Sequence, residues 1–130
     1  MKYLLDVSSL IALGIVRHEF HGRIVAWLDS QRGSSFLTCS ITELGFVRIV
    51  AQQPIYGYTV SQARAVLLEL KKDATFRFEF IPDKNDVSHL PGWVRTARQT
   101  TDGHLLELAN AHAAMLATFD DGIPGAYGIP

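Results

Sequence analysis

Residues 2–13 read KYLLDVSSLIAL, and this stretch gives the clearest indication of the fold. The apolar run from Tyr3 to Leu5 has the length of a short buried strand and stops at Asp6. Ser8 and Ser9 then precede a second apolar run, which is the pattern of a capped helix start. The stretch therefore predicts a strand followed at once by a helix, with Asp6 at the carboxyl end of the strand.

The alternation of strand and helix continues along the chain. Apolar residues three or four positions apart predict helices, whereas short apolar or alternating runs predict strands. By these patterns we expect helices over 19–29, 40–51, 59–72 and 102–114, and strands over 36–39, 76–80 and 115–119. Pro91 and Gly92 interrupt a polar segment that is expected to be a loop. The chain after Gly122 can hold at most one short edge strand.

This order of elements predicts the α/β class. We expect a single domain over 1–130, with a central, mainly parallel, twisted sheet flanked by helices. A chain of 130 residues can bury a sufficient core without a disulfide, and Cys39 is its only cysteine. No apolar stretch approaches the roughly twenty residues of a membrane helix, and the chain opens without a basic leader. We therefore expect a cytoplasmic protein with no membrane partner.

Charge gives no direct indication of a partner. The chain has 12 Lys and Arg against 13 Asp and Glu, a net charge of -1, so its overall field does not indicate nucleic-acid binding. A nuclease whose carboxylates are neutralised by bound cations need not be basic. Any inference about RNA must therefore come from a particular site.

Four acidic residues are placed where such a site would form. Asp6, Glu43 and Asp120 come at or just past predicted strand ends, and Asp102 opens the helix before the last strong strand. In open parallel sheets, ligands bind outside the carboxyl ends of the strands. Carboxylates gathered there would repel one another unless a cation neutralised them. Oxygen ligands alone favour Mg²⁺ or Mn²⁺, the ions of phosphoryl chemistry, and the number of ions stays open.

Each acid also has a purely structural interpretation. Asp6 can cap the following helix, and Asp120 can be a turn residue. Ser40-Ile41-Thr42-Glu43 fits the Ser-x-x-Glu capping box, so Glu43 can serve as a helix cap, and Asp102 can be a partner of its helix dipole. Thr59 and Gln62 form a second box of the same kind. Only the shared position of the four acids favours a common function.

Four motifs in register resemble the PIN-domain family. Residues 3–11 (YLLDVSSLI) resemble its opening strand and first acid, and 38–48 (TCSITELGFVR) resemble the segment with the second. Residues 101–109 (TDGHLLELA) resemble the third and 116–120 (LATFD) the fourth. The resemblance covers nearly the full chain and is closest to the VapC-type toxins, the ribonucleases of type II toxin–antitoxin systems.

The resemblance implies an activity, a cofactor and partners. It implies a Mg²⁺- or Mn²⁺-dependent endoribonuclease that hydrolyses RNA phosphodiester bonds, forms a homodimer and is inhibited by a VapB-like antitoxin. It also implies that the metal-binding and catalytic residues are Asp6, Glu43, Asp102 and Asp120. Ser8 stands where the family commonly has Asn, and its hydroxyl can still donate a hydrogen bond. Thr101 and Asp121 are further candidates for supporting roles, with a cap and a turn as their alternatives.

Other functions fit the sequence less well. A receiver-like phosphoacceptor domain needs a lysine late in the chain, whereas the last lysine is Lys84. Neither G-x-G-x-x-G nor a Gly-Lys-Ser/Thr loop occurs, which argues against the common nucleotide-binding folds. Two alternatives remain open: a PIN fold that has lost catalysis and only binds, and a metal-dependent nuclease that acts on DNA.

Overall fold

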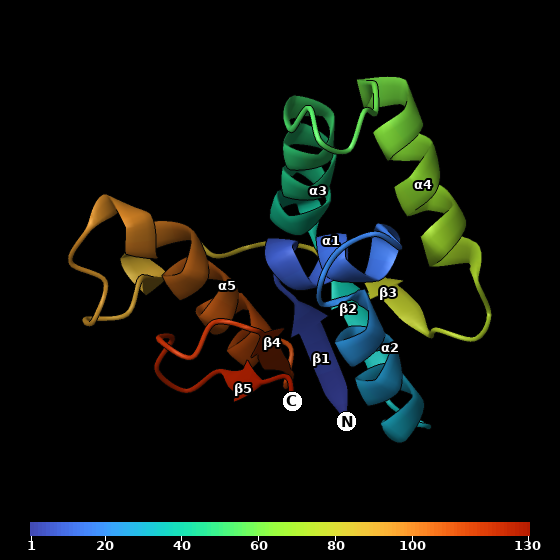
Figure 1. The fold of residues 1–130 in the computed structure, drawn as a ribbon. Helices are drawn as coiled ribbons and strands as arrows, with labels where there is room; N and C mark the ends of the chain where they lie inside the picture. The colour runs from blue at the N-terminus through green and yellow to red at the C-terminus, as the bar shows by residue number, and fades with distance from the viewer.

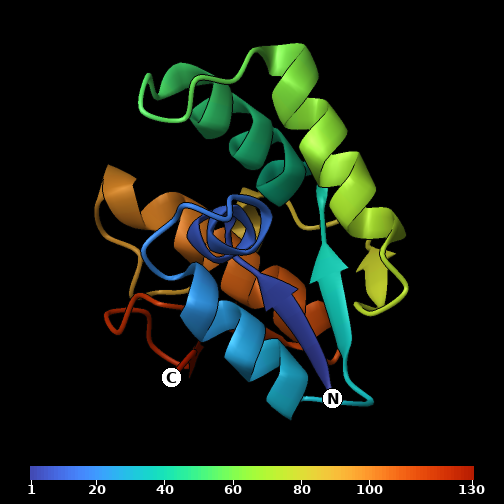
Figure 2. The same cartoon turned by 45° about the vertical axis from the view of Figure 1, so that its right-hand side comes forward.

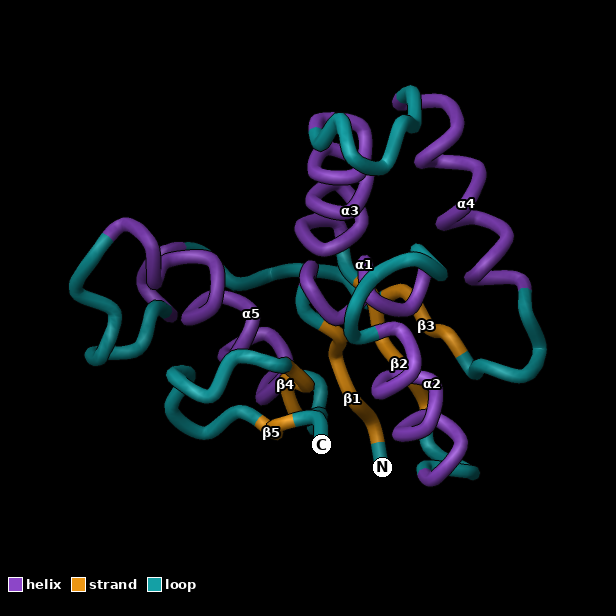
Figure 3. Tube along the Cα trace, viewed as in Figure 1, coloured by secondary structure: helices purple, strands orange, loops and turns teal.

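The first strand forms the centre of a five-stranded parallel sheet. In the computed structural model, which describes all of residues 1–130, the strand order is β3-β2-β1-β4-β5 (Figures 1 and 3). Leu4 of β1 lies opposite Leu37 on one side and Leu116 on the other. The strands are β1 Lys2–Leu5, β2 Ser35–Thr38, β3 Phe78–Phe80, β4 Met115–Thr118 and β5 Tyr127–Gly128. The predicted parallel α/β sheet is confirmed.

Helices connect the strands and cover both faces of the sheet. They are α1 Val7–Gly14, α2 His21–Ser30, α3 Ser40–Gln52, α4 Val60–Lys72 and α5 Thr100–Ala111, with short 3-10 turns at Val87–His89 and Ala97–Gln99. The pair α3 and α4 extends beyond the carboxyl ends of β1 and β2 (Figure 2). None of the helices combines the length and the apolar character that crossing a bilayer requires.

Side chains alternate between two cores because successive residues of a strand point to opposite faces. Tyr3 and Leu5 of β1 belong to the core formed with α1, α2, α3 and α4. Leu4, between them, belongs to the second core, which contains the apolar residues of α5. Both cores contain fully buried residues. Strand β1 is therefore packed on both of its faces, which fixes the position of Asp6 at its end.

A close contact brings the start of α1 near α3. Gly45 lies in the first half of α3, and a Cβ atom at this position would come within 2.6 Å of Cγ2 of Val7. Real Cβ contacts are not that short, so only glycine lets the two helices approach this closely. Val7 follows Asp6 directly, and Gly45 follows Glu43 by two residues. The contact thus brings the segments that contain the first two acids together.

The predicted boundaries differ from the structure by one to three residues, and two of the differences are informative. The helix expected over 102–114 begins earlier and ends at Ala111, because Ala113 has φ 54° and cannot continue a right-handed helix. The strand expected over 76–80 is shortened to three residues. The capping box of Thr59 and Gln62 is confirmed, with both reciprocal hydrogen bonds present.

Candidate functional site

Asp6 lies at the carboxyl end of β1 and is almost completely buried, with 6% of its surface exposed. Its Oδ1 accepts a hydrogen bond from the Ser9 N–H at 2.9 Å, so the residue caps α1 as its structural interpretation required. Its Oδ2 accepts a second bond from the Thr118 hydroxyl at 2.5 Å. Together the two bonds fix the carboxylate in one orientation at the edge of the sheet.

Thr118 connects two of the acids. It is the last residue of β4 and is 1% exposed. While its hydroxyl donates to Asp6, the same oxygen accepts a hydrogen bond from the Asp120 N–H at 2.9 Å. Asp120 is exposed and forms a turn, since its Oδ1 accepts from the Gly122 N–H at 2.8 Å. No pattern in the sequence predicted a role for Thr118. The only signal that could have indicated one is the spacing Thr-x-Asp directly after an apolar strand.

Asp102 lies in the first turn of α5, close to both of these acids. Burial raises the pKa of its carboxyl, and the charges of Asp6 and Asp120 raise this pKa further. A cavity of about 370 Å³ is lined by all three of these aspartates. Asp102 and Asp120 also line a neighbouring cavity of about 290 Å³, together with Arg98 and Gln99. The structure therefore brings three of the four predicted acids together.

Glu43 lines neither of these two cavities. Its Oε2 accepts hydrogen bonds from the Thr38 hydroxyl at 2.6 Å and from Lys71 Nζ at 2.7 Å. It lines a separate, mainly apolar cavity between α3 and α4, with Leu44 and Phe80 among the other lining residues. Lys71 comes from the last turn of α4, so a cation of the chain itself neutralises this carboxylate.

The predicted capping box that included Glu43 is wrong by one residue. The cap of α3 is Cys39, not Ser40, and its N–H donates to the hydroxyl of Thr42 at 3.0 Å. The Ser-x-x-Glu pattern predicts the wrong cap because Ser40 already belongs to the helix. The capping position is therefore the residue before Ser40. The carboxylate of Glu43 is thus not used in capping and is available for other contacts.

The three supporting candidates are placed differently. Ser8 is exposed and lines the 370 Å³ cavity with Asp6 and Asp102, a position from which its hydroxyl can reach a ligand. Thr101 and Asp121 are also exposed, but neither lines this cavity or the neighbouring one. The geometry therefore gives Ser8 a position in the site and gives the other two none.

The donor set suits a hard divalent cation. The three aspartates offer oxygen only, and the pKa of Asp102 is raised first by burial and then by the charges of Asp6 and Asp120, a repulsion that a cation would relieve. In this structure no three His, Cys, Asp or Glu side chains lie close enough together to hold a metal ion between them. Mg²⁺ commonly keeps several waters and binds through one or two carboxylates, so an open arrangement fits it better than a cage would.

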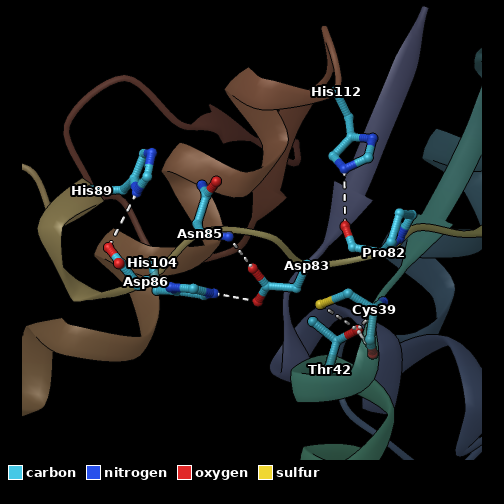
Figure 4. Close-up of polar contacts among 9 residues, drawn as sticks. All are labelled: Cys39, Thr42, Pro82, Asp83, Asn85, Asp86, His89, His104 and His112. Atoms are coloured by element: carbon cyan, nitrogen blue, oxygen red, sulfur yellow. Dashed lines mark hydrogen bonds and ion pairs between the residues drawn. The ribbon is translucent and has the colours of Figure 1, made fainter.

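The segment between β3 and α5 is bound to α5 by two histidines (Figure 4). The His104 imidazole hydrogen-bonds the Asp83 carboxylate, and His112 Nε2 contacts the Pro82 carbonyl oxygen at 3.0 Å. Burial raises the pKa of Asp83, but hydrogen bonds from His104 and from the Asn85 N–H outweigh it, and the pKa is lowered overall. His104 thus helps to hold α5, and with it Asp102, and it does not line either cavity.

Comparison with known sequences gives one consistent family. The sequence model of the PIN domain matches residues 3–128. Ribonuclease VapC38 of Mycobacterium tuberculosis is 35% identical over 127 residues, covering 92% of this chain and 86% of the relative. Ribonuclease VapC44 of the same species is 36% identical over 137 residues, covering 97% of this chain and 94% of the relative.

Solved structures share the fold at lower identity. VapBC2 from Rickettsia felis, solved bound to a DNA fragment from its promoter, superposes with a TM-score of 0.61 at 16% identity, over 98% of this chain and 96% of that one. VapC20 of Mycobacterium tuberculosis, described as a sarcin–ricin loop cleaving toxin, gives 0.60 at 12% identity, over 92% and 90%. With the sequence match over almost the whole length, this chain belongs to the PIN-domain family and is a relative of the VapC ribonucleases.

Proposed function

We propose that this chain, acting as one PIN domain over residues 1–130, is a Mg²⁺- or Mn²⁺-dependent endoribonuclease and the toxin of a VapBC-type toxin–antitoxin module. The observation that carries the proposal is the shared cavity of Asp6, Asp102 and Asp120, in which burial and then the charges of the other two raise the pKa of Asp102. The choice of RNA as substrate is supported by the relatives named as ribonucleases at 33–36% identity.

The reaction would be hydrolysis of a phosphodiester in single-stranded or looped RNA. A divalent cation held by the aspartates supplies activation of water and neutralisation of phosphate charge. Water adds to phosphorus while the bond to the 3′-oxygen breaks, which leaves a 3′-hydroxyl and a 5′-phosphate. The three aspartates come from different parts of the fold. Asp6 follows β1, Asp102 lies in the first turn of α5, and Asp120 lies in the turn after β4. Arg98, in the adjoining cavity, is placed to contact substrate phosphate.

Dependence on a divalent cation is the direct test of this proposal. We expect the purified chain to cleave hairpin and single-stranded RNA with Mg²⁺ or Mn²⁺, to stop completely with excess EDTA and to recover when Mn²⁺ is restored. Products should accept a 3′-end ligation and carry a 5′-phosphate. Cleavage that persists in EDTA would refute the proposal. DNA of the same sequence is tested in parallel. Faster cleavage of DNA than of RNA would favour the alternative of a DNA nuclease. If neither nucleic acid is cleaved, the alternative of a binding module is favoured.

Glu43 is the fourth ligand in this proposal, and Lys71 competes for it. As long as Lys71 Nζ lies 2.7 Å from Glu43 Oε2, the carboxylate is neutralised without a metal. Both side chains are only about a quarter exposed or less, so the pair is better shielded from solvent than a surface ion pair. We propose that Lys71 releases Glu43 when the cation and the substrate phosphate enter.

Replacing this lysine should strengthen metal binding. Lys71→Met keeps the aliphatic stem but removes the charge, and we expect Mn²⁺ to bind about fivefold more tightly by titration calorimetry, since about 1 kcal/mol of competition corresponds to that factor. Lys72→Met is the matched control, because Lys72 is largely exposed and pairs only with Glu69 in its own helix. Equal affinities in the two variants would show that Lys71 does not compete with the metal.

A protein partner is the last part of the proposal. The relatives solved as VapBC complexes support a VapB-like antitoxin, and we also propose a homodimer. The chain offers exposed apolar side chains for such contacts around α3 and α4: Leu44, Ile55, Val60, Leu68 and Phe80. Their exposure is unusual for a group of large apolar residues and marks a surface for protein contact.

A further inference from the structure

An aromatic wall stands beside the three aspartates. Phe20, Phe119 and His18 line the same 370 Å³ cavity as Asp6, Asp102 and Asp120. The Phe20 and Phe119 ring centroids lie 4.9 Å apart, and His18 follows at 5.7 Å from Phe20. All three rings are half-buried, so they are fixed in place and still reach the cavity. Phe119 lies between Thr118 and Asp120 in the sequence, which places the wall directly against the acidic edge.

The wall is supported from behind. The guanidinium carbon of Arg23 lies 4.7 Å from the Phe20 ring centroid and 5.0 Å from that of Phe119. Arg23 is itself held, because its Nε donates to the Pro130 carbonyl at 3.0 Å. On the other side of Phe20, its N–H donates to Nδ1 of His18 at 3.0 Å. The rings are thus positioned before any ligand binds, which lowers the entropic cost of using them as a binding surface.

We infer that this wall is a stacking subsite for one unpaired nucleobase next to the scissile phosphate. The inference rests on the proposed ribonuclease function and adds the way in which the substrate is held. Bases of single-stranded RNA can stack on aromatic side chains, whereas the faces of a base inside a duplex are already covered by its stacked neighbours. The aspartates, once neutralised by a cation, bind phosphate, so a nucleotide in this cavity has its phosphate at the acidic edge and its base at the wall. Stacking is tolerant of base identity, so the subsite selects unpaired RNA rather than one sequence.

The test separates binding from cleavage. An RNA oligonucleotide containing 2-aminopurine, whose fluorescence falls on stacking, is titrated into the Asp102→Asn form of the full chain with Mg²⁺. This background is expected to leave the RNA intact. We expect saturable quenching, and a dissociation constant raised about fivefold or more when Phe20→Leu or Phe119→Leu is added, as the loss of one stacked base predicts. Phe20→Tyr should restore binding, because it restores the aromatic face.

Phe76→Leu is the matched control, since Phe76 is a half-buried phenylalanine that lines a different cavity with Leu28 and Phe36. It should bind RNA like its parent. Binding that is unchanged in Phe20→Leu and Phe119→Leu, or lost equally in Phe76→Leu, would overturn the subsite. The proposed function fails in a different way, by an absence of cation-dependent cleavage in the unmutated chain. In that case, quenching that depends on Phe20 would still identify the wall as a base-binding surface.

Discussion

Asp102→Asn is expected to lower RNA cleavage by at least about a hundredfold while making the metal-free protein more stable. The loss of activity follows because a cation in this cavity contributes several kcal/mol to the transition state, and each 1.36 kcal/mol is a factor of about ten. The gain in stability follows because burial and the charges of Asp6 and Asp120 raise the pKa of Asp102, so the folded state disfavours its charged form. Asparagine keeps the shape and removes the repulsion.

The sign of the pH dependence provides a second measurement. Because the folded-state pKa of Asp102 is raised, this group binds its proton more readily in the folded than in the unfolded chain. Its destabilising effect is therefore full above the folded-state pKa and fades as the pH falls through that value toward the unfolded one. The melting temperatures of the unmutated chain and of Asp102→Asn, both in EDTA, should differ at neutral pH and converge in acid.

Asp121→Asn is the control for this prediction. Asp121 is an exposed aspartate next to the site that lines neither cavity, so its substitution should leave both cleavage and melting temperature nearly unchanged. The prediction for Asp102 is contradicted if Asp102→Asn cleaves RNA within a few-fold of the unmutated chain. A fall in stability at neutral pH would contradict the repulsion on which it depends.

The sequence was sufficient for the fold because its signals are local. Short apolar runs, of which the first ends at Asp6, alternate with segments long enough to be helices. This alternation predicts a parallel sheet and leaves few alternative topologies. The same pattern predicted all four acids at one edge, and the structure gathers Asp6, Asp102 and Asp120 in one cavity, whereas Glu43 lines another. The end of α5 has no such signal, because the left-handed backbone that stops this helix falls on Ala113, whereas glycine is the usual residue there.

The contacts around the acids could not be predicted in the same way. Lys71 pairs with Glu43 across 28 residues of sequence, and neither helix by itself indicates which of its side chains will meet. The aromatic wall similarly combines Phe20 from before α2 with Phe119 from after β4. Such pairs depend on the packing of whole elements, and a periodicity argument gives the face of a helix but not its neighbour.

Thr118→Val should weaken both the fold and the reaction, because one hydroxyl serves two of the acids. Valine has nearly the same shape, but it cannot donate to Asp6 Oδ2 or accept from the Asp120 N–H. Asp6 is mostly buried, so the loss of this hydrogen bond to its carboxylate should cost about 1–3 kcal/mol in the free energy of unfolding. Chemical denaturation of the metal-free chain measures this cost.

The same substitution separates positioning from folding. Without the Thr118 hydroxyl, no hydrogen bonds link Asp6 to Asp120. We therefore expect the rate of cleavage and the Mn²⁺ affinity each to fall about tenfold, which is the size of effect found when residues that hydrogen-bond metal ligands are removed. Thr118→Ser keeps the hydroxyl and should retain most of the metal affinity, although it also loses the buried methyl group. If Thr118→Val is destabilised but binds Mn²⁺ as tightly as Thr118→Ser, then Thr118 only stabilises the end of β4. If the affinity falls in the valine variant alone, the hydroxyl sets the geometry in which Asp6 and Asp120 meet the cation.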